Sequence, residues 1–451
     1  MPRRTRRGPA RADSRPEGST ALVLVGRALL RGKLQPVEVA IDDVGVIRKI
    51  GRSVPGTPRH DVGDAVILPA ATDLHVHFRE PGGPAEAETI ASGTVGAALG
   101  GIGLVGDMPN TRPPVTDEER YESKSRLVTG RSAVDVLLYA STIAPRALGP
   151  LSRRAGGFKL YLSPTTGVEA TPALSELPEL WERLAPLGLP VAVHAEDPTR
   201  FAISEGPGSP AAWNAQRPVS AENSALEALV RAPDALRLHA AHVTTAVGAN
   251  LLRAAGRSFE ATPHHLLLSE GSGTDARFKV NPPLRSEPER SALWEEFRNG
   301  RVPMLASDHA PHPLEAKLVP FDRAPSGVPG VETMLPLMLA KVRAGELDLG
   351  VLLSAACDRP ARWLGQPQGR LSVGHRANLL VVDFTRRSAV RGKVLRSPSG
   401  WSPFEGHEVV RPVEHYRDGE RIVESGEYVG RPVGRIVRPE YAPGEVAARL
   451  G

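Results

Sequence analysis

The sequence predicts an α/β protein, a (β/α)8 barrel with a small β-sandwich domain formed from both ends of the chain. Two observations support this prediction. Short apolar runs alternate with helical patterns through the middle of the chain, whereas both flanks carry short apolar runs separated by turns. With 451 residues, the chain is long enough for one large α/β domain and a smaller one.

The two flanks are expected to build one β domain. Glycines and prolines separate short apolar runs before the barrel. The same pattern of short apolar runs recurs after Gly369, where Tyr416–Val423 has the pattern of a hairpin. The runs are 21–25, 37–41 and 46–50 on one side, and 377–384, 409–410 and 416–423 on the other. The predicted division is a tail at 1–19, β-domain segments at 20–66 and 370–435, a barrel at 67–369 and a tail at 436–451.

The middle of the chain supplies eight strand-like runs separated by helical patterns, as a (β/α)8 barrel requires. The expected strands are 67–78, 102–107, 133–141, 157–162, 190–195, 236–243, 258–265 and 302–309. The expected helices are 87–99, 117–128, 175–187, 221–230, 246–255 and 286–299. Residues at the carboxyl ends of these strands are therefore expected to meet at one face of the barrel.

The overall charge and cysteine content exclude several classes of protein. Residues 1–17 hold six Arg against Asp13 and Glu17, so the remaining 50 basic and 49 acidic residues nearly balance, and nucleic-acid binding has no global electrostatic support. The Arg-rich tail is expected to be disordered and has no apolar core of a secretory signal. No apolar run has the length of a membrane span, and the single cysteine, Cys357, excludes internal disulfides. These features favour a cytoplasmic protein.

Potential metal ligands gather at the predicted strand ends. His75 and His77 are two residues apart, so on a strand they project to one face, although an isolated pair of this kind also fits two core histidines. Later strands add further candidates. The full set is His75, His77, Lys159, His194, His242 and Asp308. Nitrogen and oxygen donors of this kind suit zinc, with cobalt or manganese as substitutes.

Lys159 interrupts an apolar strand, where an unpaired ammonium group would be costly to bury. Schiff-base chemistry is one explanation, because a desolvated lysine loses its proton readily. Carboxylation by carbon dioxide is the other, and it would turn the amine into an anionic ligand able to bridge two metals. The surrounding histidines favour carboxylation.

Several motifs, in order along the chain, resemble dihydroorotase, of the amidohydrolase superfamily. The most specific are His75-Val76-His77-Phe78-Arg79-Glu80-Pro81-Gly82, Met108-Pro109-Asn110-Thr111 and Ala306-Ser307-Asp308-His309-Ala310-Pro311-His312. Further matches are 157–162, 194–196, 263–265, 281–285 and 329–336. The resemblance spans about residues 20–430.

This resemblance implies a two-zinc site. His75, His77 and Asp308 would bind the more buried metal, His194 and His242 the second, and carboxylated Lys159 would bridge them. A hydroxide held between the metals would attack the ring amide of dihydroorotate, and Asp308 would carry its proton to the leaving nitrogen. The implied reaction is the reversible hydrolysis of (S)-dihydroorotate to N-carbamoyl-L-aspartate, a step of de novo pyrimidine (UMP) synthesis.

The same resemblance implies a substrate-binding set. Arg79, Asn110 and His312 would clamp the substrate carboxylate, Asn281 would lie near the pyrimidine ring, and Thr165 would reach the substrate from a loop. Allantoinases and hydantoinases, which act on neutral rings, need no such clamp. The clamp therefore favours dihydroorotase over these alternatives.

Some residues depart from the family pattern. Lys159 resembles the dihydroorotase domain of the large animal enzyme, whereas many bacterial relatives have Asp there. Thr166 replaces a common aromatic residue, so loop closure is expected to differ. Ala241 replaces a cysteine, which argues against a third metal near Glu260. The remaining barrel histidines, His239, His264, His265 and His309, are interpreted as structural.

A non-catalytic scaffold for aspartate transcarbamoylase is a further alternative, but such chains usually lose metal ligands and this one retains all six. The resemblance also implies a homodimer, and an association with aspartate transcarbamoylase. A small-molecule substrate is expected, with no nucleic-acid or membrane partner.

Overall fold

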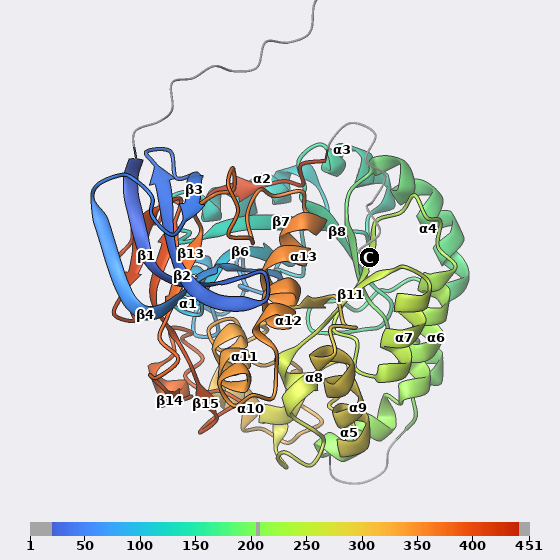
Figure 1. Ribbon diagram of the computed structural model, residues 1–451. Coiled ribbons are helices and arrows are strands. Elements are labelled where there is room, and N and C mark those ends of the chain that lie inside the picture. Colours follow the sequence, from blue (N-terminus) through green and yellow to red (C-terminus); the bar gives the residue numbers. More distant parts are fainter. Residues whose placement is uncertain (1–19, 204–207, 442–451) are drawn as a thin grey trace, which may run out of the picture.

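The computed structural model describes residues 20–203 and 208–441 (Figure 1). The predicted tail 1–19 and the last ten residues lie outside the described residues. Figure 1 shows a barrel wrapped by helices and, beside it, a sheet that combines the first and last strands of the chain.

The barrel strands pair in parallel and follow one another around the barrel in chain order. They are β5 (Ala71–Val76), β6 (Ile102–Asp107), β7 (Asp135–Ser141), β8 (Gly157–Tyr161), β9 (Val191–His194), β10 (Leu238–Ala240), β11 (Ser258–Ala261) and β12 (Met304–Leu305). The ring approaches closure where Val76 bridges to His309 and the amide of His77 donates to the His309 carbonyl at 2.8 Å. The predicted parallel barrel is confirmed.

Helices follow most barrel strands and cover the outside of the barrel (Figure 1). They are α1 (Ile90–Leu99), α2 (Glu118–Val128), α3 (Leu148–Ser152), α4 (Leu177–Leu184), α5 (Pro210–Gln216), α6 (Val219–Val230), α7 (Ala246–Ala254), α8 (Pro263–Leu267), α9 (Glu287–Arg298), α10 (Leu314–Lys317), α11 (Met334–Arg343), α12 (Leu349–Leu353) and α13 (Arg359–Trp363). Side chains cap several helix starts: Asp117 accepts from the amide of Arg120, and Thr245 from that of Gly248. In the described residues, no helix is both long and apolar enough to cross a membrane.

The predicted small β domain formed from both chain ends is confirmed, and it is built around one largely antiparallel sheet. Its strands, in the order β18-β17-β16-β13-β4-β1-β2-β3, run antiparallel except for the parallel pair β1 and β4. They are β1 (Thr20–Leu30), β2 (Lys33–Asp42), β3 (Ile47–Gly51), β4 (Arg59–Pro69), β13 (Leu379–Val382), β16 (Pro412–Arg417), β17 (Glu420–Glu424) and β18 (Glu427–Tyr428). A separate small pair is β14 (Ser388–Ala389) with β15 (Glu408–Val409). Asp418 and Gly419 both adopt positive φ, as a two-residue hairpin turn between β16 and β17 requires.

Seven of the eight predicted barrel strands are shorter than expected. The expected strand 258–265 ends at Ala261, because Thr262 caps the helix α8 that begins at Pro263. Two other differences have a clear cause. The apolar run 65–71 is divided between sheets, because the Ala70 amide donates to the carbonyl of Asn378, just before β13, and the Ala71 amide to that of Gly101, just before β6. Pro69, which has no amide hydrogen, marks this transfer. The expected strand 302–309 is reduced to β12, since Asp308 turns to φ +43° and leaves the extended conformation.

The C-terminal segment is partly built into the barrel. β19 (Ile436–Val437) pairs in parallel with Val136 and Leu137 of β7, next to Asp135. Asp135 is buried and accepts hydrogen bonds from Arg376, Arg417 and Arg435, which links the barrel to the β sheet. The predicted boundary between barrel and β segments stays a prediction.

Candidate active site

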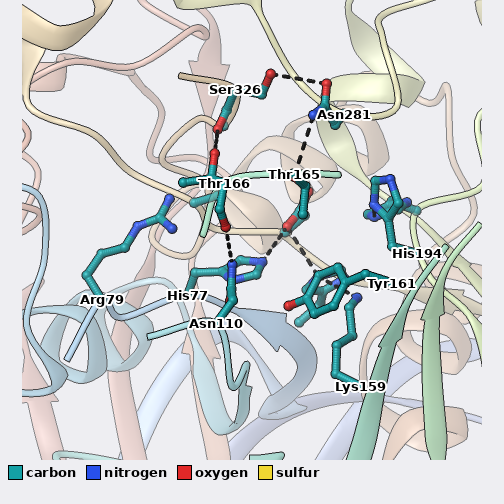
Figure 2. A pocket seen from close by; sticks show the side chains of 15 residues that line it. His77, Arg79, Asn110, Lys159, Tyr161, Thr165, Thr166, His194, Asn281 and Ser326 are labelled. Carbon is teal, nitrogen blue, oxygen red and sulfur yellow. Dashed lines mark hydrogen bonds and ion pairs between the residues drawn. The ribbon is translucent and has the colours of Figure 1, made fainter. Parts of the chain in front are cut away.

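A pocket opens at the carboxyl ends of the barrel strands (Figure 2). Ten of the eleven predicted site residues line it, and they come from segments far apart in the sequence. The lining residues are His75, His77, Arg79, Asn110, Lys159, Tyr161, Thr165, Thr166, His194, His242, Asn281, Asp308, Ala310, Ser326 and Gly327. The eleventh, His312, lies directly behind the lining, with its Nε2 atom 3.2 Å from Nη2 of Arg79.

The predicted metal ligands converge at the floor of this pocket. Asp308 Oδ1 lies 3.3 Å from His75 Nε2 and 3.2 Å from His77 Nε2. His75, His242 and Asp308 each offer a ligand atom within 4.8 Å of the others. Lys159 Nζ is 3.3 Å from His75 Nε2. These spacings are those of atoms grouped around a shared centre.

Hydrogen bonds behind the cluster decide which imidazole nitrogen faces it. His75 Nδ1 lies 2.7 Å from Glu260 and His77 Nδ1 lies 2.7 Å from Asn110 Oδ1, so the Nε2 atom of each ring is left for the centre. On the opposite side, His194 Nε2 contacts Glu196 at 2.8 Å, which leaves its Nδ1 atom facing inward. Such outer contacts orient the ligands of a metal and raise their basicity.

The histidines of the cluster are neutral at neutral pH, as metal ligands must be. Burial lowers the pKa of His75 to about 4 and holds the pKa of His77 and His242 well below the ordinary value. Burial also lowers the pKa of His194, although Glu196 opposes that shift. Neutral imidazoles beside a carboxylate form a donor set that fits a divalent ion such as zinc.

Three pocket residues adopt left-handed backbone conformations. Arg79 has φ +63°, His242 φ +38° and Asp308 φ +43°. Residues with a Cβ atom adopt this region at an energetic cost, and such strain is concentrated at functional sites. In each case the chain turns sharply just after a barrel strand, which directs the side chain into the pocket.

Lys159 is fully buried and, among the described residues, has no carboxylate partner within ion-pair distance. Burial lowers the pKa of its ammonium group to about 8. A fraction of the side chain is therefore the free amine near neutral pH, and the free amine is the form that reacts with carbon dioxide.

Two residues of the predicted carboxylate clamp, Arg79 and Asn110, line the pocket (Figure 2), and the third, His312, contacts Arg79 from behind the lining. The Arg79 Nε group donates to the Pro311 carbonyl at 3.0 Å, and His312 Nε2 lies 2.9 Å from the Ser326 carbonyl. Burial lowers the pKa of Arg79 to about 10, so the guanidinium keeps its charge at neutral pH. Asn110 accepts from His77 through Oδ1 and donates to the Thr166 carbonyl at 2.9 Å through Nδ2.

The loop that carries Thr165 and Thr166 lies against the pocket. Thr166 Oγ1 donates to the Ser326 carbonyl at 3.2 Å, and Asn281 Nδ2 lies 3.5 Å from Thr165 Oγ1 (Figure 2). Thr166, which stands where an aromatic residue is common, therefore forms polar contacts with the opposite wall of the pocket.

The histidines interpreted as structural lie outside the pocket lining. His239 contacts Glu260 at 2.8 Å, His265 contacts the Pro282 carbonyl at 3.0 Å, and His309 contacts Glu88 at 3.0 Å. The carboxylate of Glu260 thus spans His239 and His75. Burial alone would raise the pKa of Glu260, but these two imidazoles outweigh it and hold the pKa below its usual range.

Some pocket residues were not identified from the sequence. Tyr161 lines the pocket two residues after Lys159, and the two-residue period of a strand is a signal that could have found it. Ser326 comes from a segment without strand or helix pattern, and no local pattern marks it. Glu196, in the matched segment 194–196, lies outside the pocket lining and acts through His194 and the ion pair with Arg217.

Comparisons with known proteins bear on this geometry. The model of the family described as "Amidohydrolase family" matches residues 66–405. The chain belongs to the amidohydrolase family. Members of this family typically bind metal, in agreement with the cluster of His75, His242 and Asp308.

Relatives within the amidohydrolase family include archaeal dihydroorotases. The dihydroorotase of Halobacterium salinarum is 37% identical over 386 residues, covering 83% of this chain and 90% of its own length. That of Thermoplasma volcanium is 34% identical over 419 residues, covering 92% and 97%. Among solved structures, L-hydantoinase from Arthrobacter aurescens superposes with a TM-score of 0.86 at 27% identity, covering 93% of this chain and 100% of its own.

Proposed function

We propose that this protein is a dihydroorotase, which interconverts (S)-dihydroorotate and N-carbamoyl-L-aspartate in pyrimidine synthesis. The observation that carries the proposal is a buried guanidinium, Arg79, in the same pocket as the cluster of His75, His77 and Asp308. A cyclic amide that also bears a carboxylate fits this pocket, because its amide would lie at the metal cluster and its carboxylate at Arg79. The dihydroorotases among the relatives at 33–37% identity support the same substrate.

The proposed site holds two zinc ions. His75, His77 and Asp308 would bind one and His194 and His242 the other, and carboxylated Lys159 would bridge them. Bound zinc would supply an acidified water as nucleophile and polarise the amide carbonyl.

The carboxylation of Lys159 needs only carbon dioxide. The free amine of Nζ forms a bond to the carbon atom and one proton leaves, which gives an anionic carbamate. Burial of Lys159 and a pKa lowered to about 8 support this step, because they raise the fraction of free amine.

The chain's own residues would bind and orient the substrate. Arg79 would pair with the carboxylate, since a guanidinium offers two parallel N–H donors to a carboxylate. Asp308, held beside His75 and His77, would accept the proton of the nucleophile and deliver it to the leaving ring nitrogen. Thr165 and Thr166 would limit access of bulk water above the ring.

A hydantoinase is the second candidate, and the structural similarity to L-hydantoinase favours it. A neutral ring, however, offers no partner for the charge of Arg79. The proposal of a non-catalytic scaffold is weaker, because all six predicted ligands line one pocket.

The test is an assay of purified protein with dihydroorotate, carbamoyl-aspartate, allantoin and dihydrouracil, together with a measurement of bound metal. Turnover of dihydroorotate with about two zinc ions per chain is expected. Turnover of allantoin or dihydrouracil without dihydroorotate would overturn the proposal. We further propose a cytoplasmic homodimer that associates with aspartate transcarbamoylase, which size-exclusion chromatography of the two enzymes tests.

A further inference from the structure

The side chain of Asn281 lines the pocket, and its two ends differ in chemistry. The Oδ1 atom can only accept hydrogen bonds and the Nδ2 atom can only donate them. The orientation of the amide therefore decides whether Asn281 offers the substrate a donor or an acceptor.

Two donors beside the amide set this orientation: Trp213, outside the pocket lining, and Ser326, which lines the pocket. The indole Nε1 of Trp213, on α5, lies 3.0 Å from Asn281 Oδ1, and the Ser326 hydroxyl lies 3.1 Å from the same atom (Figure 2 shows the latter contact). The indole N–H group is shared, since Nε1 also lies 3.1 Å from the Val280 carbonyl, but it can only donate, and the amide oxygen is therefore the end of Asn281 that faces it. The Nδ2 group is consequently turned away from Trp213, toward Thr165.

Asn281 Nδ2 is available to a ligand. Its contact with Thr165 Oγ1 is 3.5 Å long, at the limit of a hydrogen bond, so turning to a substrate atom loses little. Figure 2 shows Asn281 and Arg79 on different sides of Thr165 and Thr166. A ring whose carboxylate pairs with Arg79 and whose scissile carbonyl lies at the metal cluster has one more acceptor, the carbonyl between its two nitrogens.

We propose that Trp213 is a positioning residue that, with Ser326, sets Asn281 as a hydrogen-bond donor to the carbonyl between the two ring nitrogens. This inference rests on the proposed function and names the part of the substrate that this side of the pocket recognises. Trp213 is itself held in place, because its ring lies 4.4 Å from Lys279 Nζ and packs edge-on against Phe321.

The test is a double-mutant cycle with Trp213→Phe and Asn281→Leu. Phenylalanine keeps an aromatic ring beside Lys279 and Phe321 but lacks the N–H donor. That carbonyl is bonded to the leaving ring nitrogen and shares its charge as the ring opens, so loss of the contact is expected to lower kcat/KM. We expect kcat/KM for dihydroorotate hydrolysis to fall about three- to tenfold in Trp213→Phe, and further when Ser326→Ala is added.

The decisive readout is the coupling between the two sites. In the Asn281→Leu background there is no amide to orient, so adding Trp213→Phe is expected to change kcat/KM by less than about twofold. A purely structural role would make the two effects multiply. Multiplicative effects, or an unchanged kcat/KM in Trp213→Phe, would overturn the inference. Trp294→Phe, in α9 and outside the pocket lining, is the matched control, and melting temperatures identify loss of folding.

Failure of the proposed function is distinguishable from failure of this inference. If the wild-type protein hydrolyses dihydrouracil but not dihydroorotate, the proposed function is wrong, and the cycle is measured with dihydrouracil, which has the same carbonyl between two nitrogens. If it hydrolyses neither ring, both proposals are overturned.

Discussion

Replacement of Arg79 by methionine tests whether this side chain selects the substrate carboxylate. Arg79 is only 8% exposed, and its Nε group is already held by the Pro311 carbonyl, so the guanidinium is positioned before substrate binds. A hydrogen bond to a charged partner contributes about 1.5–3 kcal/mol, which corresponds to a loss of about 10- to 150-fold in kcat/KM for dihydroorotate. Hydrolysis of a neutral hydantoin or dihydrouracil is expected to change by less than about threefold.

The Arg79→Met substitution does not change the strain of the backbone at residue 79. Residue 79 has φ +63°, and methionine, like arginine, carries a Cβ atom and has a similar length. Arg79→Lys is the matched control, since it keeps the charge but loses the forked geometry, and an intermediate loss is expected. Steady-state kinetics on charged and neutral substrates measure the difference. Equal losses on both would show that Arg79 supports the structure of the pocket and does not recognise the carboxylate.

Three further predictions concern the metal cluster and the β sheet. Lys159→Ala is expected to lose metal and activity, with partial recovery in short carboxylic acids; a fully active variant would refute the bridging role. Glu260→Gln replaces one of the two carboxylate oxygens that contact His75 and His239 by an NH2 group, which cannot accept a hydrogen bond. Metal affinity, measured by competition with a chelator, should therefore fall about 10- to 100-fold. Unchanged affinity would count against a role of Glu260 in orienting His75. Burial lowers the pKa of His415 to about 4, so the unfolded chain binds more protons between about pH 6.5 and 4 and stability is lost as the pH falls through this window. The pKa shift of His415 corresponds to about 3 kcal/mol in the free energy of unfolding. Urea unfolding at several pH values should show that this free energy falls less steeply with pH in His415→Gln than in the wild-type protein.

The barrel and its metal cluster could be predicted because both follow from local patterns and one global rule. His75 and His77 share a strand face, and parallel strands of a barrel present their carboxyl ends on one side. Residues as distant as His194 and Asp308 therefore had to approach one another once the strands were recognised.

Other features depend on contacts that no local pattern encodes. The transfer of the chain from one sheet to the other between Ala70 and Ala71 is set by which neighbour each amide finds, Asn378 or Gly101. Within the apolar run there, only Pro69 gives any sign of the change. Trp213 likewise lies far from Asn281 in sequence, and the orientation of an amide is decided by the donors that surround it.

Asn110 illustrates how one side chain could serve two parts of the site. The resemblance implies a role at the substrate carboxylate, which stays a prediction, and in the structure its Oδ1 atom accepts from the metal-cluster residue His77. These assignments are compatible because the amide has a second end, Nδ2, which donates to the Thr166 carbonyl. The Nδ2 group carries two hydrogens, so a carboxylate could accept the second one while the Thr166 carbonyl keeps the first. The orientation of His77 does not need to change, since its hydrogen bond uses the other atom of the amide.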